Sequence, residues 1–577
     1  MSLTSSLYIA NSALTTSQVG LQVTSQNLAN AATPGYTRQI ALLQALRGRT
    51  TDPFMIGSGV GVNEVRRQID TALQSRLWNA NSAEFGSAQQ LNVFNQLEAI
   101  LNEGTDFDFS SELSSFFNTW SEATTLLDSS STVVNQGKSL ATFIQNIRSD
   151  LVDQRQQVEN QIDSEVNRAN ALFGEIADIN ATISTSEIGQ TEAGALRDRR
   201  DQIVTELAQL MEITAVETNQ GGYDIFIGST PIVQGNRSRG VEIERQTTNG
   251  TVGVQVITSD NNDTLTVNTG SIGGLLSSRD GAIDETIDKL DTIASNLIFE
   301  VNKIHSTGIN EDWLTSALGT LQISAANQTL PLNDPTNEDL ANLPYAPSNG
   351  GFYVHIRNDD TGTSDQVWIP VDLDGIDTLG AASTADDTSA EDIRAAIEAA
   401  GGPGGPLTAT FDPSGRLQIS AAPGFSFSFS EDSSGALATL GVNTFFEGTD
   451  ATNIAVREDV NVMLGRLAPD GSFSANENAN LLGKLGEQAI EALGGHSIEK
   501  FWSLQTQDIA VLTSSARTQA DSSFIVRQSL DGQRAAVSGV SIDEESINLM
   551  TYQRQYQGAA QVITTAQQMF DTLLTLV

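Results

Sequence analysis

The sequence predicts an α+β protein of several domains, because helical and strand-like patterns occupy separate stretches of a long chain. At 577 residues the chain exceeds what one hydrophobic core usually supports, so we expect about three or four domains. Apolar residues recur every three or four positions at both ends and through much of the interior, which predicts helices. Two internal stretches, 213–269 and 306–475, instead show alternating apolar and polar residues separated by glycines and other turn residues, which predict strands.

The N-terminal stretch predicts one arm of a coiled coil. Leucines seven positions apart form one row, and a second row on the same face holds smaller residues after its first leucine. The leucines of the two rows are Leu3, Leu7, Leu14, Leu21 and Leu28. Thr33-Pro34-Gly35 ends the helix, because the residue before a proline avoids α geometry and glycine permits a turn. Ser, Thr, Gln and Asn are common here, so we expect the helix to become ordered only when partner helices cover it.

The C-terminal stretch predicts the matching arm. One row of residues seven apart is Ile542, Leu549, Tyr556, Ile563, Phe570 and Val577. The second row is Glu545, Tyr552, Ala559, Ala566 and Leu573, of which only Glu545 suits a coiled-coil seam poorly. Ser541 is expected to cap this helix and Glu544 to complete a capping box, after Gly539 breaks the preceding helix.

Two such stretches at opposite ends of the chain predict that residues 1–36 and 541–577 pair as terminal coiled-coil helices. The alternative is that each amphipathic helix packs separately onto an ordinary core. The energetics favour an assembly segment, because ordering a polar helix costs about 1–2 kcal/mol per residue and a buried leucine contributes only about 1.5–3 kcal/mol.

Between the ends, residues 37–61 contain Pro53 and a glycine run, which predict an extended linker or hairpin. Helical patterning is expected again from Val62, and it returns on both sides of the strand-like stretches. These segments predict an elongated antiparallel helical bundle formed by residues 62–212, 270–305 and 476–540. Within the last of them we expect one helix at 476–493 and another at 498–537.

The two strand-like stretches are expected to be inserted into that bundle. Residues 213–269 predict a small β module, and residues 306–475 predict an inserted, mostly-β region of one or two domains. A short helix is expected near 390–399. Because the larger region is inserted, we expect it to project outward from the helices.

Two terminal runs also resemble the signatures of bacterial flagellar axial proteins, the rod, hook and junction proteins. The C-terminal run is 541–574, and the N-terminal run includes Asn27, Leu28, Ala29, Asn30, Thr33, Pro34, Gly35 and Tyr36. Two internal runs, Leu196–Ile203 and Gly273–Asp280, narrow the resemblance to the FlgK family of first hook–filament junction proteins. The resemblance covers the segments on either side of the region 311–475, about which it says little.

The resemblance implies a structural, non-catalytic subunit at the junction between hook and filament. It implies export through the flagellar type III channel without cleavage and a location outside the cell. The implied partners are like subunits in a ring, the flagellar hook protein, the second hook–filament junction protein, and a cytoplasmic export chaperone at the C-terminal helix. Two alternatives stay open: another axial protein of hook or rod, and a secreted adhesin or enzyme acting through residues 306–475.

Composition excludes several classes of partner. With 71 acidic and 30 basic residues the net charge is −41, which argues against binding nucleic acid or an anionic membrane surface. Cysteine is absent, so disulfides cannot stabilise the chain. We expect no signal peptide and no membrane-spanning segment, because no suitable apolar run is present.

The sequence shows no catalytic constellation, so we expect no enzyme, cofactor or metal site. His305, His355 and His496 lie in different segments, without a second histidine at metal-binding spacing. The run Asp372–Asp377 hints at calcium but lacks the loop length and terminal Glu of an EF-hand, so a turn between strands is the preferred interpretation. Gly401–Gly405 predicts a flexible turn rather than a phosphate cradle, because no helix with a lysine follows it.

Overall fold

The computed structural model describes residues 3–51, 54–104, 108–125, 130–188, 192–248, 251–376, 380–402 and 404–575. The fold is α+β, with long helices and several small sheets. The chain divides into two compact units, each assembled from segments far apart in the sequence. Unit 1 comprises residues 1–93, 157–280 and 513–577, and unit 2 comprises residues 94–156 and 281–512.

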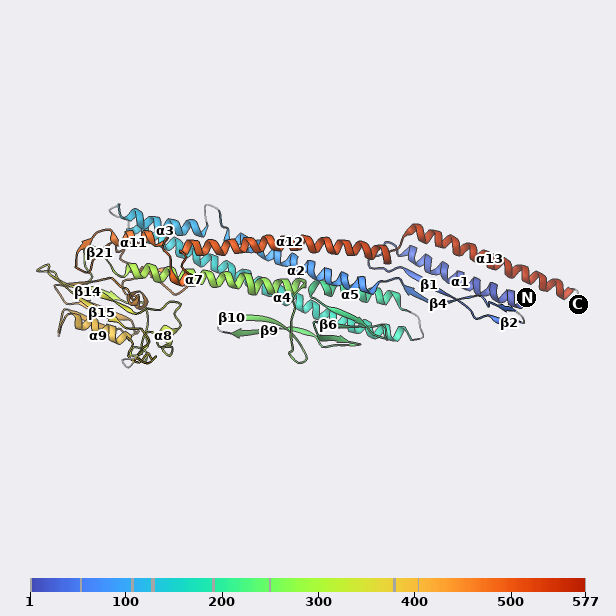
Figure 1. Ribbon diagram of the computed structural model, residues 1–577, viewed down its shortest axis with the longest axis horizontal. Coiled ribbons are helices and arrows are strands. Elements are labelled where there is room, and N and C mark those ends of the chain that lie inside the picture. The colour runs from blue at the N-terminus through green and yellow to red at the C-terminus, as the bar shows by residue number, and fades with distance from the viewer. Residues whose placement is uncertain are drawn as a thin grey trace. The chain divides into compact units, whose positions relative to one another are not determined.

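Three long helices contribute residues to both units (Figure 1). They are α2 (Thr71–Leu101), α4 (Ser130–Ser186) and α12 (Ile498–Ser538). Each carries the apolar three-to-four spacing seen in the sequence and buries part of its apolar surface, although α12 leaves Val511, Phe524 and Ile525 exposed. Among the described residues, no helix is both long enough and apolar enough to cross a membrane.

The two ends of the chain form a helix pair in unit 1. Figure 1 shows α1 (Leu3–Ala29) and α13 (Ile542–Thr575) side by side. They run antiparallel, because Asn27 near the end of α1 contacts Glu545 near the start of α13. Ser541 caps α13 by accepting a 3.4 Å hydrogen bond from the backbone N–H of Glu544.

Residues after α1 form strands rather than a loose linker. β1 (Gln39–Ala45) pairs antiparallel with β4 (Val60–Arg67), and β2 (Arg49–Thr51) pairs with β3 (Phe54–Ile56). Pro53 lies outside the described residues.

The expected helix start at Val62 is wrong, because Val62 belongs to β4 and α2 begins only at Thr71. Asp70 marks that start, since its carboxylate accepts 3.0 Å hydrogen bonds from the N–H groups of Ala72 and Leu73. The apolar spacing of the strand resembled helical spacing by chance, and the capping residue carried the better signal.

The β module of unit 1 contains two small antiparallel sheets. The first has the order β5 (Thr214–Glu217), β6 (Tyr223–Ile227), β7 (Thr230–Gln234) and β8 (Arg237–Ser238). The second has the order β11 (Thr264–Leu265), β10 (Thr251–Thr258) and β9 (Val241–Thr248). α5 (Gly194–Leu210) precedes these sheets and α6 (Gly270–Ser277) follows them.

The helix expected at 270–305 is interrupted. A π-helical segment, Ser278–Ile283, joins α6 to α7 (Asp284–His305). Arg279 lies in this segment, only 1% exposed, and donates to the backbone carbonyl of Val252 in β10. A π segment re-aims side chains relative to an α-helix, and here one of them reaches the sheet.

In unit 2, helices pack around a cluster of aromatic residues. α3 (Phe109–Ala123) lies against α11 (Glu477–Leu485), and α11 also contacts α7. Phe116 and Trp120 of α3 pack edge-on or tilted against Phe445 and Phe446, with ring centroids 5.3–5.9 Å apart. We expected one helix over 476–493, but α11 ends at Leu485. A turn through Gly494 and Gly495, both with positive φ, and a short 3₁₀ helix (Glu491–Leu493) follow instead.

The insert in unit 2 is mostly β, with a core between two three-stranded sheets. One sheet has the order β15 (Ser364–Val371), β14 (Gly350–Asn358) and β18 (Phe425–Ser430). The other has the order β13 (Ser316–Leu318), β17 (Leu417–Ala421) and β16 (Leu407–Phe411). α9 (Ala390–Ala400), the short helix expected near 390–399, packs on β15 and β16. The core includes Phe352, Val354, Ile393, Ile419, Phe427 and Phe429.

Short elements complete unit 2. Two small sheets pair β12 (Gly308–Ile309), β21 (Gly465–Leu467) and β22 (Phe473–Ser474), and β19 (Phe446–Glu447) with β20 (Ala455–Val456). The short helices are α8 (Glu338–Ala341) and α10 (Ala436–Leu440).

His305 is a buried, neutral histidine of unit 2. Its Nδ1 lies 2.9 Å from the carbonyl oxygen of Asn443, and its Nε2 accepts a 3.3 Å hydrogen bond from the N–H of Met463. Nε2 therefore carries no proton. Burial, which outweighs the hydrogen bond to Asn443, lowers the pKa of His305 to about 4.

We predict that unit 2 loses stability as the pH falls from about 6.5 toward 4. In that window the unfolded chain binds a proton at residue 305 that the folded chain does not bind, at a cost of about 3 kcal/mol. His355, whose pKa burial also lowers, contributes in the same direction. Unfolding midpoints measured across this pH range should fall less steeply for His305→Gln than for the parent. His496→Gln, at an exposed position, should keep the parent slope, and equal slopes in all three proteins would contradict the assignment.

α2 and α6 cross at glycines. A Cβ on Gly274 would overlap the backbone carbonyl of Gly86, and a Cβ on Gly86 would lie 2.9 Å from the carbonyl oxygen of Gly270. Because backbone atoms cannot move aside as a flexible side chain can, this crossing requires glycine.

We predict that Gly274→Ala destabilises unit 1 by about 1–3 kcal/mol, because the added methyl group forces α2 and α6 apart. The matched control is Gly174→Ala in α4, where a Cβ meets no atom within 4 Å. That control should stabilise the protein by up to about 1 kcal/mol, since alanine is the better helix former. Urea unfolding followed by circular dichroism measures the free energy of unfolding of both variants. An unchanged value for Gly274→Ala would contradict the close crossing of α2 and α6.

Candidate assembly interface

The run after α1 forms a turn that is seated on α5. The N–H of Tyr36 donates to the carbonyl of Thr33 at 3.2 Å, and Gly35 has a φ of +76°, in the left-handed region that favours glycine. The Nε2 of Gln202 in α5 donates to the carbonyl of Pro34 at 2.9 Å, and a Cβ on Gly35 would overlap this side chain. Pro34 and Gly35 therefore bring the end of α1 into contact with α5.

Asn27 lies at the centre of the contacts between the chain's two ends. It is 1% exposed. Its Nδ2 donates to the carbonyl of Gln39 at 2.9 Å and to Glu545 Oε2 at 3.1 Å. Its Oδ1 accepts from the Tyr36 hydroxyl at 2.8 Å and from the N–H of Gln39 at 2.9 Å. All four hydrogen-bonding positions of the amide are used, so no other side chain of this size could replace it.

Tyr36 serves this network as a hydrogen-bond donor. Burial, and then the charges of Asp198 and Glu545, raise the pKa of Tyr36 to about 12. The hydroxyl therefore keeps its proton at physiological pH and donates a hydrogen bond to Asn27.

Glu545 carries a buried charge in the helix pair, although the heptad pattern marked it as a poor seam residue. It is 2% exposed and accepts from Arg38 through two guanidinium nitrogens at 2.8 Å. Arg38 also bonds Glu544 at 3.0 Å, and its backbone N–H donates to the carbonyl of Ser538 at 2.9 Å. Sequence reasoning missed this pair. The available signal was an arginine following the signature run and an acidic residue at a seam position.

The helix pair buries small and polar side chains rather than the predicted apolar rows. The buried residues are Ala10, Thr16, Ser17, Gly20, Val23, Thr24 and Asn27 on α1, and Glu545, Ala559 and Ala566 on α13. A Cβ on Gly20 would lie 2.6 Å from the ring of Tyr552, so the helices approach closely at this point. The contact between the two helices of one chain is thus made mainly by residues of the second row of each helix.

The predicted apolar rows remain partly or fully accessible. On α1, Leu3, Leu7, Leu14, Leu21 and Leu28 are half-buried. On α13, Leu549, Tyr552, Ile563 and Phe570 are half-buried, whereas Ile542, Tyr556 and Leu573 are 58%, 37% and 50% exposed. Val577 lies outside the described residues. Within the chain the smaller residues make the nearer approach, and the role of these rows as an assembly seam stays a prediction.

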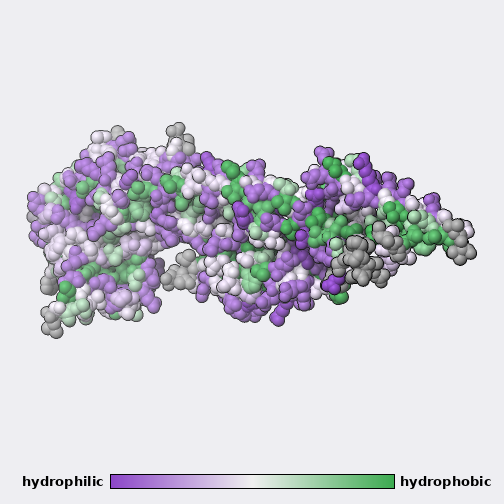
Figure 2. Space-filling view, turned by 45° about the vertical axis from the view of Figure 1, so that its right-hand side comes forward, coloured by the Kyte–Doolittle hydropathy of each residue, from purple (hydrophilic) through white to green (hydrophobic). Residues whose placement is uncertain are grey.

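Further apolar side chains extend this accessible surface along α13. They are Ile547, Met550, Val562, Met569 and Leu574, each at least 48% exposed. Figure 2 shows hydrophobic residues gathered along the terminal helices. A groove of about 630 Å³ opens between the two helices, lined by Ile9, Ala13, Leu43 and Val562 among others. Contiguous apolar surface of this kind marks sites of association.

Arg67 joins the β1–β4 sheet to α5 through three carboxylates. Its side chain is 2% exposed and bonds Glu192 at 3.0 Å, Asp198 at 2.8 Å and Asp201 at 2.7 Å. Asp198 also accepts a 3.2 Å hydrogen bond from the N–H of Thr37. Burial raises the pKa of Asp198, while Arg67 opposes that shift. The run Leu196–Ile203 therefore supplies acceptors that hold the segment after α1.

Two buried arginines of the internal runs reach the β module in the same way. Arg200 is 0% exposed, bonds Asp201 at 3.0 Å, lies 3.4 Å from the ring centroid of Tyr223 and donates to the carbonyl of Gly221. Arg279 bonds Glu159 at 2.7 Å in addition to its bond to β10. Both runs thus bind a helix to a sheet. Arg200 and Arg279 are each held by a carboxylate and by a backbone carbonyl of the β module, so they position these elements.

Family models match three parts of the chain. A model described as the flagellar hook-associated protein FlgK helical domain matches residues 94–316. Models of the flagella basal body rod protein and of the flagellar basal body rod FlgEFG protein C-terminal match residues 7–37 and 533–576. The two terminal matches cover most of α1 and α13.

Curated relatives match nearly the whole chain. Flagellar hook-associated protein 1 of Salmonella typhimurium is 25% identical, over 98% of this chain and 99% of the relative. The protein of the same name is 23% identical in Escherichia coli, over 98% of both chains. In Bacillus subtilis it is 24% identical, over 98% of this chain and 97% of the relative. A solved structure of the flagellar hook junction protein FlgK from Burkholderia pseudomallei is 14% identical, with a TM-score of 0.47, and covers 80% of this chain and 100% of its own.

We predict that Glu545→Gln loosens α13 from α1. The substitution leaves Arg38 without its buried counter-charge and should lower the local stability of the pair by about 1–3 kcal/mol. Hydrogen exchange of the first turns of α13 reports this as a loss of protection of about ten- to hundredfold. Glu544→Gln, whose side chain is 63% exposed, is the matched control and should change protection little. Equal protection in the two variants would show that the buried pair does not hold α13.

Proposed function

This chain belongs to the FlgK family of flagellar hook-associated proteins, and we propose that it joins hook to filament by polymerising through the apolar rows of α1 and α13. The family is structural rather than enzymatic, it is located in the flagellum, and its members associate with other components of hook and filament.

The proposal rests on the difference in burial between the two rows of each terminal helix. Small residues of the second rows are buried within the chain, and the large residues of the first rows remain accessible. Fully burying one such Leu, Ile or Phe side chain contributes about 1.5–3 kcal/mol. A helix pair bearing a row of them gains most of its stability from neighbours, which is the behaviour required of an assembly segment.

Like subunits are the proposed first partner of these rows. Each copy presents the same accessible apolar rows, so copies around a ring can bury them against one another. The matches of α1 and α13 to rod-protein models support this arrangement, because they indicate a terminal segment shared among axial proteins. We propose the hook protein on one side of that ring and the second hook–filament junction protein on the other, with residues 306–475 facing outward.

An exposed apolar α13 also requires protection before assembly. We propose that a cytoplasmic export chaperone covers this helix, and that the chain leaves the cell through the flagellar type III channel to act outside it. The absence of cysteine is compatible with that route, since an exported chain then carries no thiol to oxidise.

We predict that Leu21→Asp and Ile563→Asp each block incorporation at the junction. A carboxylate in either row becomes a desolvated, unpaired charge when a neighbouring subunit covers it. Gln18→Asp and Gln561→Asp add the same charge to exposed positions on the same helices and should leave incorporation intact. The measurement is filament formation by cells whose own copy is replaced by each variant, with circular dichroism of the purified protein to verify folding. Normal filaments from both row variants would end the proposal.

A further inference from the structure

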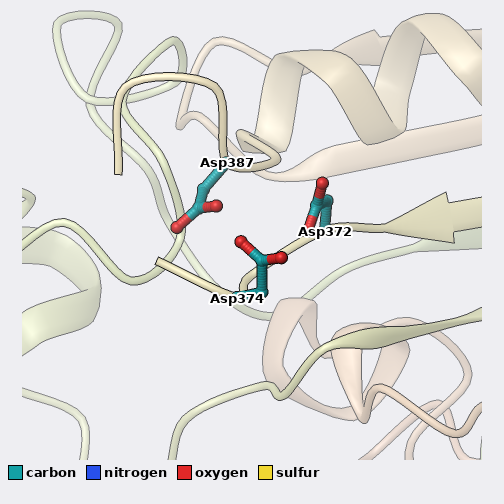
Figure 3. Close-up of side chains that lie close together, drawn as sticks. All are labelled: Asp372, Asp374 and Asp387. Atoms are coloured by element: carbon teal, nitrogen blue, oxygen red, sulfur yellow. The ribbon is translucent and has the colours of Figure 1, made fainter. Parts of the chain in front are cut away.

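Three aspartates converge where β15 leads into α9. Asp372 and Asp374 follow the last residue of β15, and Asp387 lies shortly before α9. One carboxylate oxygen from each lies within 4.8 Å of the others. Figure 3 shows the three carboxylates directed into one space. In the sequence, the run Asp372–Asp377 hinted at calcium, although a turn between strands was the preferred interpretation. The fold brings Asp387, which lies outside that run, to the same place.

No basic residue of the insert compensates these charges. Residues 306–475 contain five arginines and no lysine. Four of the five pair with other carboxylates: Arg357 with Asp359, Arg394 with Glu391 and Glu398, Arg416 with Asp412, and Arg457 with Asp459. The fifth, Arg466, lies in the field of Glu431 and Glu477. Among the described residues of the insert, no arginine or lysine therefore forms an ion pair with the cluster.

Asp387 is the buried member of the cluster. It is 4% exposed, and its Oδ2 accepts from Asn333 Nδ2 at 2.6 Å and from the N–H of Gly375 at 3.2 Å. Among the residues that the structure describes, its buried Oδ1 has no hydrogen-bond partner, and neither does the buried Oδ1 of Asn333. A buried carboxylate oxygen is costly unless a donor or a cation satisfies it, and one carboxylate oxygen of Asp387 lies within 4.8 Å of those of the other two aspartates (Figure 3).

We propose that Asp372, Asp374 and Asp387 bind a calcium ion. Oxygen donors alone select a hard cation. Calcium binds oxygens at about 2.3–2.6 Å, so ligands on opposite sides of the ion can be about 5 Å apart, which the cluster meets as it stands. Magnesium demands a tighter octahedron and keeps most of its waters, so converging carboxylates favour calcium.

The ion would stabilise the connection between β15 and α9. The N–H of Asp372 donates to Thr388 Oγ1 at 2.8 Å, which already brings the two ends of the connection together. Directly after it, Ser389 and Asp392 form the capping box that starts α9. An ion held by residues on both sides of the connection would resist its opening, so calcium should stabilise the insert by mass action.

The test uses the full-length protein, freed of metal with a chelator and titrated with calcium chloride in a calorimeter and in thermal unfolding. We expect saturable binding in the range of about 10⁻⁵–10⁻³ M and an unfolding midpoint that rises with calcium. The double variant Asp372→Asn/Asp374→Asn alters two exposed positions and should lose both signals while keeping its circular dichroism spectrum. Asp360→Asn/Asp365→Asn removes the same charge from exposed positions of the same insert and should keep both.

The variant Asp387→Asn is a second test of the same site. The asparagine keeps an acceptor for Asn333 and Gly375 and turns an N–H toward the two remaining carboxylates. Its midpoint without calcium should therefore rise above that of the parent, and its response to calcium should vanish. Absence of calcium binding by the parent, or equal losses in the control variant, would overturn the site. Saturation by magnesium chloride at the same concentrations would overturn the assignment to calcium.

Discussion

The arrangement of unit 1 depends on buried arginine–carboxylate pairs. Arg67 binds the sheet after α1 to α5, and Arg38 binds the same sheet to α13 through Glu545. Taking such charges out of water is expensive, and leaving one partner alone is more expensive still. Only one register of α13 against α1 places Glu545 at both Arg38 and Asn27. The pairs thus contribute more to the choice of arrangement than to the total free energy of folding, and the weaker apolar contacts of the helix pair follow the register that they select.

This explains why much of the fold could be predicted from the sequence while the contacts of the interface could not. Apolar spacing located α1, α9 and α12 to within a few residues, because a helix that buries one face must repeat that face. The same spacing failed at Val62, where a strand happened to place apolar residues three or four apart, and at 476–493, where α11 ends at Leu485 and Gly486 caps it. Periodicity records which residues avoid water and says nothing about which element they meet.

The terminal rows show the same limit at the candidate site. The pattern identified both rows of α1 and α13 but not which residues are buried within the chain, and these are mostly the smaller ones. Gly20 and Ala559 permit close approach, which a leucine would prevent. Glu545 was the one residue that the pattern rejected, and it is among the most buried residues of α13. A charge at a seam position needs a named counter-charge, and Arg38 could be assigned to it only once the turn after α1 was known.

The antiparallel pairing of α1 with α13 has a consequence for incomplete chains. The face of α1 that contains Gly20 and Asn27 is covered by residues from the far end of the sequence. A chain interrupted at any point before Ile542 would leave that face bare and Arg38 without Glu545. Such a fragment could fold its interior and still lack a finished end to present to its neighbours. A truncated copy would therefore lack the completed helix pair through which we propose that neighbouring subunits associate.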